Sequence, residues 1–161
     1  MARVVDRPIE RGADAPSRVT FYYLAADSIR TINIAFCGEG AGVRDENGFL
    51  GIVERPASSY AGHELFPDVY SKAAAYLHGF ATTQFFRDGN KRTGFLSATV
   101  FLGIHDYIWV GPSVDDAEGF LLEVAANRRD EQEVARWLKH YCLPRSERPI
   151  VRPPNAGNEW L

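Results

Sequence analysis

TTQFFRDGNKRTGFLSATVFL, residues 82–102, places a short polar loop directly against a strongly apolar segment. Asp88, Gly89, Asn90, Lys91 and Arg92 set an acid, a glycine, an amide and two cations in succession. A glycine before the first turn of a helix leaves backbone N–H groups unpaired at the positive end of the helix dipole. The stretch therefore predicts a buried helix from about residue 90 to 105 whose first turn can bind an anion such as phosphate.

The side chains of the loop suggest a nucleotide with a metal ion. Lys91 and Arg92 would add charge and donors to such a site, and Asn90 an amide donor. Asp88 would repel a phosphate unless a divalent cation bridged the two, as Mg²⁺ does in nucleotide sites. The competing interpretation is an ordinary Asp-Gly turn, with both cations solvated on the helix surface.

Helical periodicity dominates the rest of the chain, which predicts a mainly α, compact bundle. A helix is expected over residues 20–36, with Thr20 as its N-cap and Gly38 and Gly40 as its stop signal. The strongest helical segment opens at Pro67 and should fade near residues 82–84. Later helices are expected to run to residue 126 and to about residue 141, the first capped by Ser113 or Asp115 and the second by Asp130.

Turn signals and prolines delimit the remaining segments. Asn47-Gly48 predicts a short hairpin-like flap within residues 44–55. Residues 1–19 are expected to form an N-terminal arm, residues 20–143 the domain, and residues 144–161 a proline-rich C-terminal tail that cannot continue as helix.

Composition narrows the class of protein. The chain has 161 residues, a net charge of −3 and 45% hydrophobic residues, so no global positive field would draw it to nucleic acid or to a membrane. Its two cysteines lack metal-ligand spacing. We find no membrane-spanning run and no signal peptide pattern, and we therefore expect a cytoplasmic protein.

The motif and its flanks resemble the Fic/Doc (Fido) family. QFFRDGNKRT is similar to the signature loop of that family, which reads His-x-Phe-x-Asp/Glu-Gly-Asn-Gly/Lys-Arg. The resemblance extends to VRDENGFLGIVERPASS, which is similar to the segment before the family's flap. It also includes the flanking helices, ELFPDVYSKAAAYLHGFATTQFF before the loop and TGFLSATVFLGIHDY after it. It covers roughly residues 20–141 and implies a Fido-type helical bundle.

Two positions resemble the death-on-curing (Doc) branch of the family. Lys91 stands where AMP-transferring members have glycine, and Phe95 stands where they have a second arginine. The resemblance implies a toxin of a toxin–antitoxin pair that transfers phosphate from ATP to a protein, with transfer of a nucleotidyl group as the less favoured alternative. It implies an antitoxin as partner and a protein substrate, for which elongation factor Tu is the type known in that branch.

The resemblance also implies roles for the loop residues. Asp88 would hold Mg²⁺, Gly89 and Asn90 would form the anion nest, and Lys91 and Arg92 would contact the phosphates of ATP. Phe86 would anchor the loop in the core, and the flap near residues 47–58 would align the target peptide.

Gln84 departs from the family pattern, since it stands where the resemblance places the catalytic histidine. A neutral amide can orient a hydroxyl but cannot accept its proton, and general-base catalysis contributes roughly 10²–10⁴ in rate. Phosphoryl transfer depends mostly on positioning and electrostatics, so a slow enzyme and a catalytically inactive nucleotide- or protein-binding pseudoenzyme both remain open. His63 is the histidine best placed to replace the base, and a plain helical interaction module is the third interpretation.

Overall fold

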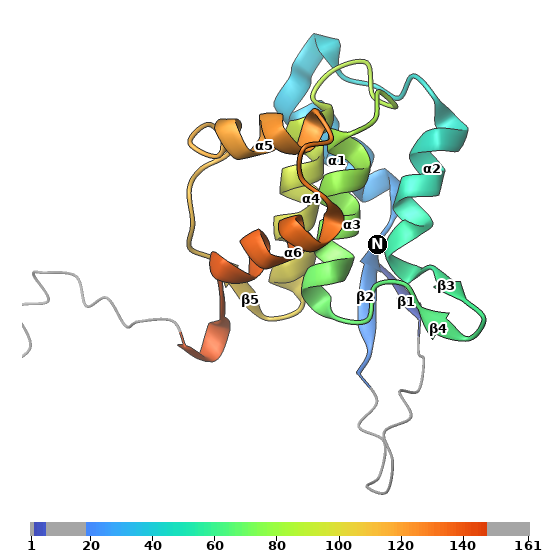
Figure 1. The fold of residues 1–161 in the computed structure, drawn as a ribbon. Helices are drawn as coiled ribbons and strands as arrows, with labels where there is room; N and C mark the ends of the chain where they lie inside the picture. The colour runs from blue at the N-terminus through green and yellow to red at the C-terminus, as the bar shows by residue number, and fades with distance from the viewer. Residues whose placement is uncertain (1, 6–18, 148–161) are drawn as a thin grey trace, which may run out of the picture.

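The computed structural model describes residues 2–5 and 19–147, and the described residues are mainly α-helical, as the sequence predicts (Figure 1). The helices are α1 (Ala26–Cys37), α2 (Glu46–Glu54), α3 (Val69–Ala81), α4 (Asn90–Ile104), α5 (Glu118–Ala125) and α6 (Glu131–His140). Short 3-10 turns are η1 (Gly38–Gly40), η2 (Arg55–Ala57) and η3 (Arg145–Glu147). Three two-stranded antiparallel sheets pair β1 (Ala2–Val5) with β2 (Phe21–Leu24), β3 (Ser59–Tyr60) with β4 (His63–Glu64), and β5 (Tyr107–Trp109) with β6 (Cys142–Pro144).

Helices α3 and α4 lie side by side at the centre of the molecule, and the loop that joins them sits at one end of the bundle (Figure 1). Asp68 starts α3 with a capping box, because its carboxylate accepts from the N–H groups of Tyr70 and Ser71 at 2.9 Å. Gly94 lets the two helices approach closely, since a Cβ there would lie 2.8 Å from the carbonyl oxygen of Leu77. The close approach fixes where the connecting loop must turn.

A buried aromatic cluster anchors that loop. The ring of Phe86 is fully buried, with its centroid 5.4 Å from those of Phe49 and Phe80. Burying a ring of this size contributes about 1.5–3 kcal/mol, which is enough to fix the middle of a short loop. The expectation that Phe86 anchors the loop in the core agrees with this placement.

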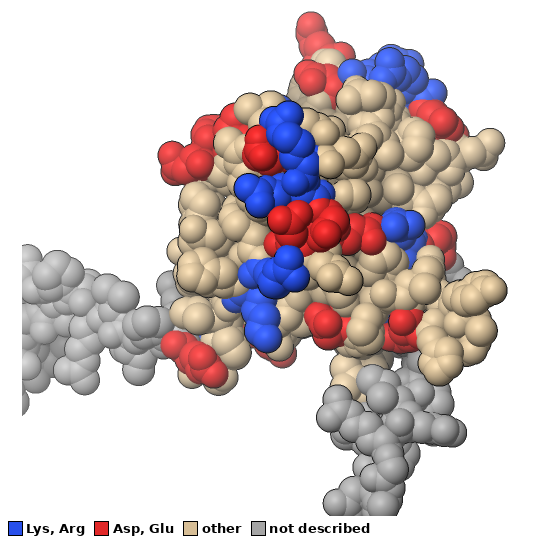
Figure 2. Space-filling model, in the orientation of Figure 1, with Lys and Arg blue, Asp and Glu red and all other residues tan. Residues whose placement is uncertain are grey.

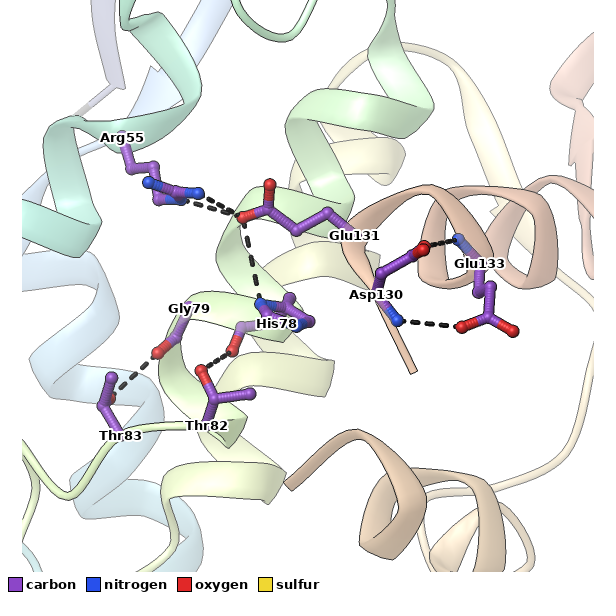
Figure 3. A network of polar contacts seen from close by, with 8 residues as sticks. All are labelled: Arg55, His78, Gly79, Thr82, Thr83, Asp130, Glu131 and Glu133. Carbon is purple, nitrogen blue, oxygen red and sulfur yellow. Dashed lines mark hydrogen bonds and ion pairs between the residues drawn. The ribbon is translucent and has the colours of Figure 1, made fainter. Parts of the chain in front are cut away.

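Side-chain hydrogen bonds end α3 just before Gln84 (Figure 3). The hydroxyls of Thr82 and Thr83 donate to the carbonyl oxygens of His78 and Gly79, at 2.7 and 2.9 Å. The bond from Thr83 satisfies the Gly79 carbonyl, and the bond from Thr82 adds to the backbone bond that the His78 carbonyl accepts from Thr82 N–H at 3.0 Å. The chain therefore leaves α3 in a defined direction.

The polar network of Figure 3 also links α3 to α6 and η2. Arg55 donates to one carboxylate oxygen of Glu131 at 2.6 and 2.9 Å, and His78 Nδ1 lies 3.8 Å from the same oxygen. Asp130, the expected cap, starts α6 through a capping box with Glu133. The network holds the C-terminal half of α3 against two neighbouring elements.

Two expected elements are wrong in position or type. Residues 21–24 form a strand, not the first turn of a helix, because their backbone pairs with Ala2–Val5 and three of their four side chains are buried. Helix α1 accordingly begins at Ala26, without Thr20 as its cap, although Gly38 ends it as expected. Strand pairing in the folded protein overrides the local helical pattern here. The pattern could not predict this pairing, because the partner strand lies far from β2 in the sequence.

The short hairpin also lies elsewhere in the chain than the predicted residues 44–55. Asn47-Gly48 falls in the first turn of α2, where the carboxylate of Asp45 caps the helix by accepting from Gly48 N–H at 2.9 Å. The short hairpin is formed instead by β3 and β4, and its turn residues Ala61 and Gly62 both have positive φ. Residues 6–18 and 148–161 lie outside the described residues, so the boundaries of the arm and the tail stay a prediction. No helix among the described residues has both the length and the apolar character to cross a membrane.

His105 ties β2 to the end of α4. Its Nε2 accepts from the N–H of Tyr22 at 3.0 Å, while its Nδ1 lies 2.7 Å from the carbonyl oxygen of Phe101 and donates to it. Burial lowers the pKa of His105 below its ordinary value of 6.5, and the bond to Phe101 opposes that shift only in part. The folded protein therefore favours the neutral ring, which can accept the Tyr22 bond.

This placement predicts a pH dependence of stability. A lowered folded-state pKa contributes stability that is present above about pH 6.5 and is lost as the pH falls, because the unfolded chain then binds the proton more readily. The free energy of unfolding of the wild type should fall more between about pH 7.5 and about pH 5.5 than that of His105→Leu. Urea titrations at both pH values measure this, with the exposed His63→Gln as the control that keeps the wild-type slope. Parallel slopes for wild type and His105→Leu would refute the prediction.

Candidate functional site

The loop between α3 and α4 presents a helix N-terminus to solvent. Gly89 caps α4 in a left-handed conformation, with φ of 73°, and no side chain caps the helix. Among the described residues, the backbone N–H groups of Asn90, Lys91 and Arg92 have no hydrogen-bond partner, and the first helical bond is Thr93 N–H to Gly89 oxygen. The first turn of this 15-residue helix therefore carries three donors at the positive end of its dipole.

Asn90 contributes through its backbone, not through its side chain. Its Oδ1 accepts from Phe86 N–H at 2.9 Å and its Nδ2 donates to Phe86 oxygen at 3.0 Å, so the amide is consumed within the loop. The expectation that this amide would be a donor for a ligand therefore does not match the geometry. Asn90 is buried, and its amide holds the backbone of the loop beside the aromatic anchor Phe86.

All six predicted site residues line one pocket. Its volume is about 530 Å³, within the range of small-molecule sites. The predicted residues in its wall are Gln84, Asp88, Gly89, Asn90, Lys91 and Arg92. The opposite wall comes from the end of α1 and from α5 with the segment before it, contributed by Phe36, Cys37, Val114, Glu118, Leu121 and Ala125. The loop wall is polar, while the α1 and α5 wall is mainly apolar apart from the carboxylate of Glu118, and the two walls suit a ligand with an anionic end and a flat apolar end.

Acidic residues from the α5 region pair with both cations of the loop. Lys91 Nζ lies 2.9 Å from Glu118 Oε1, and Arg92 Nη2 lies 3.2 Å from Asp115 Oδ1. The sequence predicted Asp115 only as a possible helix cap and did not single out Glu118. A ligand phosphate would compete with these carboxylates for Lys91 and Arg92.

Gln84 is held by its backbone and leaves its side chain exposed at the pocket. The guanidinium of Arg44 donates to the Gln84 carbonyl oxygen at 2.9 and 3.1 Å, and the N–H of Arg44 donates to Phe85 oxygen at 2.7 Å. No histidine is among the described residues that line the pocket, and His63 lies in β4. The pocket wall therefore offers no imidazole in place of an amide at position 84.

Asp88 is the carboxylate closest to the donors of α4. Its side chain is exposed, and its Oδ1 accepts from Gly89 N–H at 2.6 Å. The described residues contain no group of three or more side chains that could hold a metal ion by themselves. A single carboxylate fits Mg²⁺ that takes its other ligands from phosphate oxygens and water.

Asn33 is a residue behind the site that sequence reasoning missed, as it missed Arg44 and Glu118. It is 1% exposed on α1, and its amide bonds to the loop, to α4 and to the segment after η1. The sequence feature that could have identified Asn33 is its amide on the apolar face of a predicted helix, one turn after Ile29. Buried polar groups need partners, and two of the partners of Asn33, in the loop and on α4, lie 55 and 60 residues away in the chain.

Comparison with known proteins agrees with this geometry. Residues 23–102 match the model of the Fic/DOC family. The chain is 35% identical over 125 residues to Toxin Doc of Mycolicibacterium smegmatis, which covers 77% of this chain and 95% of that protein. The chain belongs to the Fic/Doc family. The matched region contains the predicted loop, the helices on either side of it and the segment that carries Arg44.

The surface charges of this Fic/Doc protein do not form one extended patch on the face seen in Figure 2, where blue and red side chains alternate in a band. Ion pairs account for part of this mixture, including Arg128 with Glu123 at 2.7 Å and Arg129 with Glu133 at 3.2 Å. A nucleic-acid surface would instead need a continuous positive stripe.

Gly89 should be intolerant of a side chain. Its positive φ costs an L-residue about 1–2 kcal/mol, and a Cβ would collide with Cys37 Sγ. We expect Gly89→Ala to lower the free energy of unfolding by more than that amount in the wild type, and by only about that amount in a Cys37→Ala background. A double-mutant cycle measured by urea unfolding tests this. Equal losses in both backgrounds would show that the thiol does not limit the turn.

Proposed function

We propose that this protein is a Doc-like toxin of a toxin–antitoxin pair. It transfers phosphate from Mg-ATP to a hydroxyl group of a protein target and does so slowly. The observation that supports the proposal best is the first turn of α4, where three N–H groups, Lys91 and Arg92 line one pocket with Asp88. The similarity to Toxin Doc supports the assignment of this protein to the Doc-like toxins.

ATP fits the two-sided pocket by its chemistry. Its phosphates would accept from the N–H groups of α4 and pair with Lys91 and Arg92. Its base would lie against the apolar wall that includes Leu121 and Ala125. Mg²⁺, held by Asp88 and phosphate oxygens, would neutralise charge on the transferred group.

The transfer is a substitution at the γ-phosphorus. The target hydroxyl oxygen bonds to phosphorus as the bond to the β–γ bridging oxygen breaks, and ADP leaves. Gln84 orients the hydroxyl by a hydrogen bond, and the hydroxyl proton passes to water because an amide cannot accept it. The loose transition state needs mainly position and charge, so the reaction proceeds without a base at a reduced rate.

The partners follow from the same proposal. The target is a protein, with elongation factor Tu as the candidate that the Doc branch suggests, and an antitoxin protein would control the toxin in the cytoplasm. The predicted flap near residues 47–58 stays the candidate for aligning the target peptide, because its first residues lie against the loop, where Gly48 packs on the ring of Phe85. The β3–β4 hairpin lies at the other end of α3, away from the pocket (Figure 1). A catalytically inactive pseudoenzyme is the alternative function, and the absence of a histidine from the described pocket wall favours it.

Calorimetry with Mg-ATP and transfer from γ-labelled ATP test the proposal together. We expect the wild type to bind Mg-ATP, and Lys91→Met to weaken binding about tenfold or more, since a charge-assisted bond is lost. Lys139→Met is the matched control, because Lys139 is an exposed residue of α6 that lies outside the pocket. Gln84→His should accelerate protein labelling by about 10²–10⁴ relative to a slow wild type.

Each outcome separates the alternatives. If the wild type labels a protein slowly and Gln84→His labels the same protein faster, the proposed enzyme is supported. Labelling by Gln84→His alone would show a pseudoenzyme that keeps the nucleotide site. No binding of Mg-ATP to the wild type would reject both forms.

Glu118 should act as a competitor of the nucleotide. Glu118→Gln removes the carboxylate that pairs with Lys91 while keeping its size, so Mg-ATP should bind about two- to fivefold more tightly, as expected for a solvent-exposed pair. The gain should shrink at high salt. Glu123→Gln is the control on the same helix, because Glu123 pairs with Arg128 and lies outside the pocket wall. Equal affinities for Glu118→Gln and wild type at low salt would contradict this role.

A further inference from the structure

Asn33 joins three separate segments at the back of the loop. Its Oδ1 accepts from Gly42 N–H at 2.9 Å. Its Nδ2 donates to the carbonyl oxygen of Asp88 at 2.9 Å and to Thr93 Oγ1 at 3.0 Å. Because the side chain is 1% exposed, water cannot replace these bonds if they are broken.

The two buried amides of the site fix different parts of the loop. Asn90 holds Phe86, at the end of the loop that enters the core. Asn33 holds Asp88, at the end that faces the pocket. No other hydrogen bond to the Asp88 carbonyl oxygen is recorded among the described residues, so the position of this peptide depends on Asn33.

The neighbouring segment packs against the same residue. A Cβ on Gly40 would lie 3.2 Å from Asp88 Oδ2, so η1 limits where the carboxylate can move. The bond from Gly42 N–H to Asn33 holds the segment that follows η1 in register with the loop. One amide thus fixes the backbone of Asp88 and the wall beside its carboxylate.

We propose that Asn33 is a positioning residue that places the Asp88 carboxylate for the metal ion of bound Mg-ATP. The inference rests on the proposed nucleotide function. Asn33 does not line the pocket and acts through the Asp88 peptide and the Thr93 hydroxyl. Because the Asn90 side chain keeps its bonds to Phe86 and the first turn of α4 keeps its free N–H groups, loss of Asn33 affects the magnesium-dependent part of binding most.

Asn33→Leu is the variant that tests the inference, since it keeps a neutral side chain of similar size and removes every hydrogen bond. Calorimetry measures the affinity for ATP with saturating Mg²⁺ and again with a chelator, at a temperature where circular dichroism shows each protein folded. We expect the affinity for Mg-ATP to fall about tenfold or more, and the affinity for magnesium-free ATP to fall much less.

Two matched variants on α4 complete the design. Thr93→Val removes one acceptor of Asn33 and should lower Mg-ATP affinity in the same direction by a smaller factor. Ser97→Ala removes another buried hydroxyl, one turn later, which has no hydrogen-bond partner among the described residues, and should leave affinity unchanged. If Asn33→Leu does not fold, the comparison of Thr93→Val with Ser97→Ala decides the question.

The outcomes distinguish this inference from the proposed function. A wild type that does not bind Mg-ATP removes the proposed function itself. A wild type that binds, together with an Asn33→Leu protein of unchanged affinity, overturns the role of Asn33 alone. Equal losses with and without Mg²⁺ would also overturn it, because they would indicate a collapsed loop and not a displaced carboxylate. Identical affinities for Thr93→Val and Ser97→Ala would do the same.

Discussion

The left-handed backbone at Gly89 is the constraint on which the rest of the site depends. The chain must leave α3, turn within eight residues and start α4 with its first N–H groups directed at solvent. Only a glycine adopts that turn without strain, and Cys37 packs where a side chain would project. The donors of α4 and the carboxylate of Asp88 therefore face one pocket because a single residue permits the turn between them.

Buried amides and a buried ring hold this turn in place. Phe86 supplies apolar anchorage, while Asn90 and Asn33 satisfy backbone groups that would otherwise be buried without partners. Backbone bonds between the loop and the segment after η1 add to these contacts, since the N–H groups of Arg44 and Arg87 each donate to a carbonyl oxygen of the other segment. The rigidity of the site comes from polar contacts between distant segments as much as from the helices.

Electrostatics explains how a site built for anions can stand in a protein of negative net charge. Lys91 and Arg92 are paired with Glu118 and Asp115, so their charge is locally balanced. A nucleotide that carries its own divalent cation would exchange one set of negative partners for another. In the proposed function, Gln84 would leave the binding contacts unchanged and would alter only the step in which a proton is taken.

The sequence by itself determined the helical class and the core helices α3, α4 and α6, and its resemblance to the Fic/Doc family pointed to the anchor Phe86 and to six residues that line one pocket. These features follow from local periodicity, capping residues and one compact motif, which depend on neighbours a few residues away. Only the tertiary structure decided that residues 21–24 form a strand, that the hairpin lies at residues 59–64, and that Asn33, Arg44 and Glu118 serve the loop. Those outcomes depend on contacts between residues far apart in the chain, whose geometry no local pattern encodes.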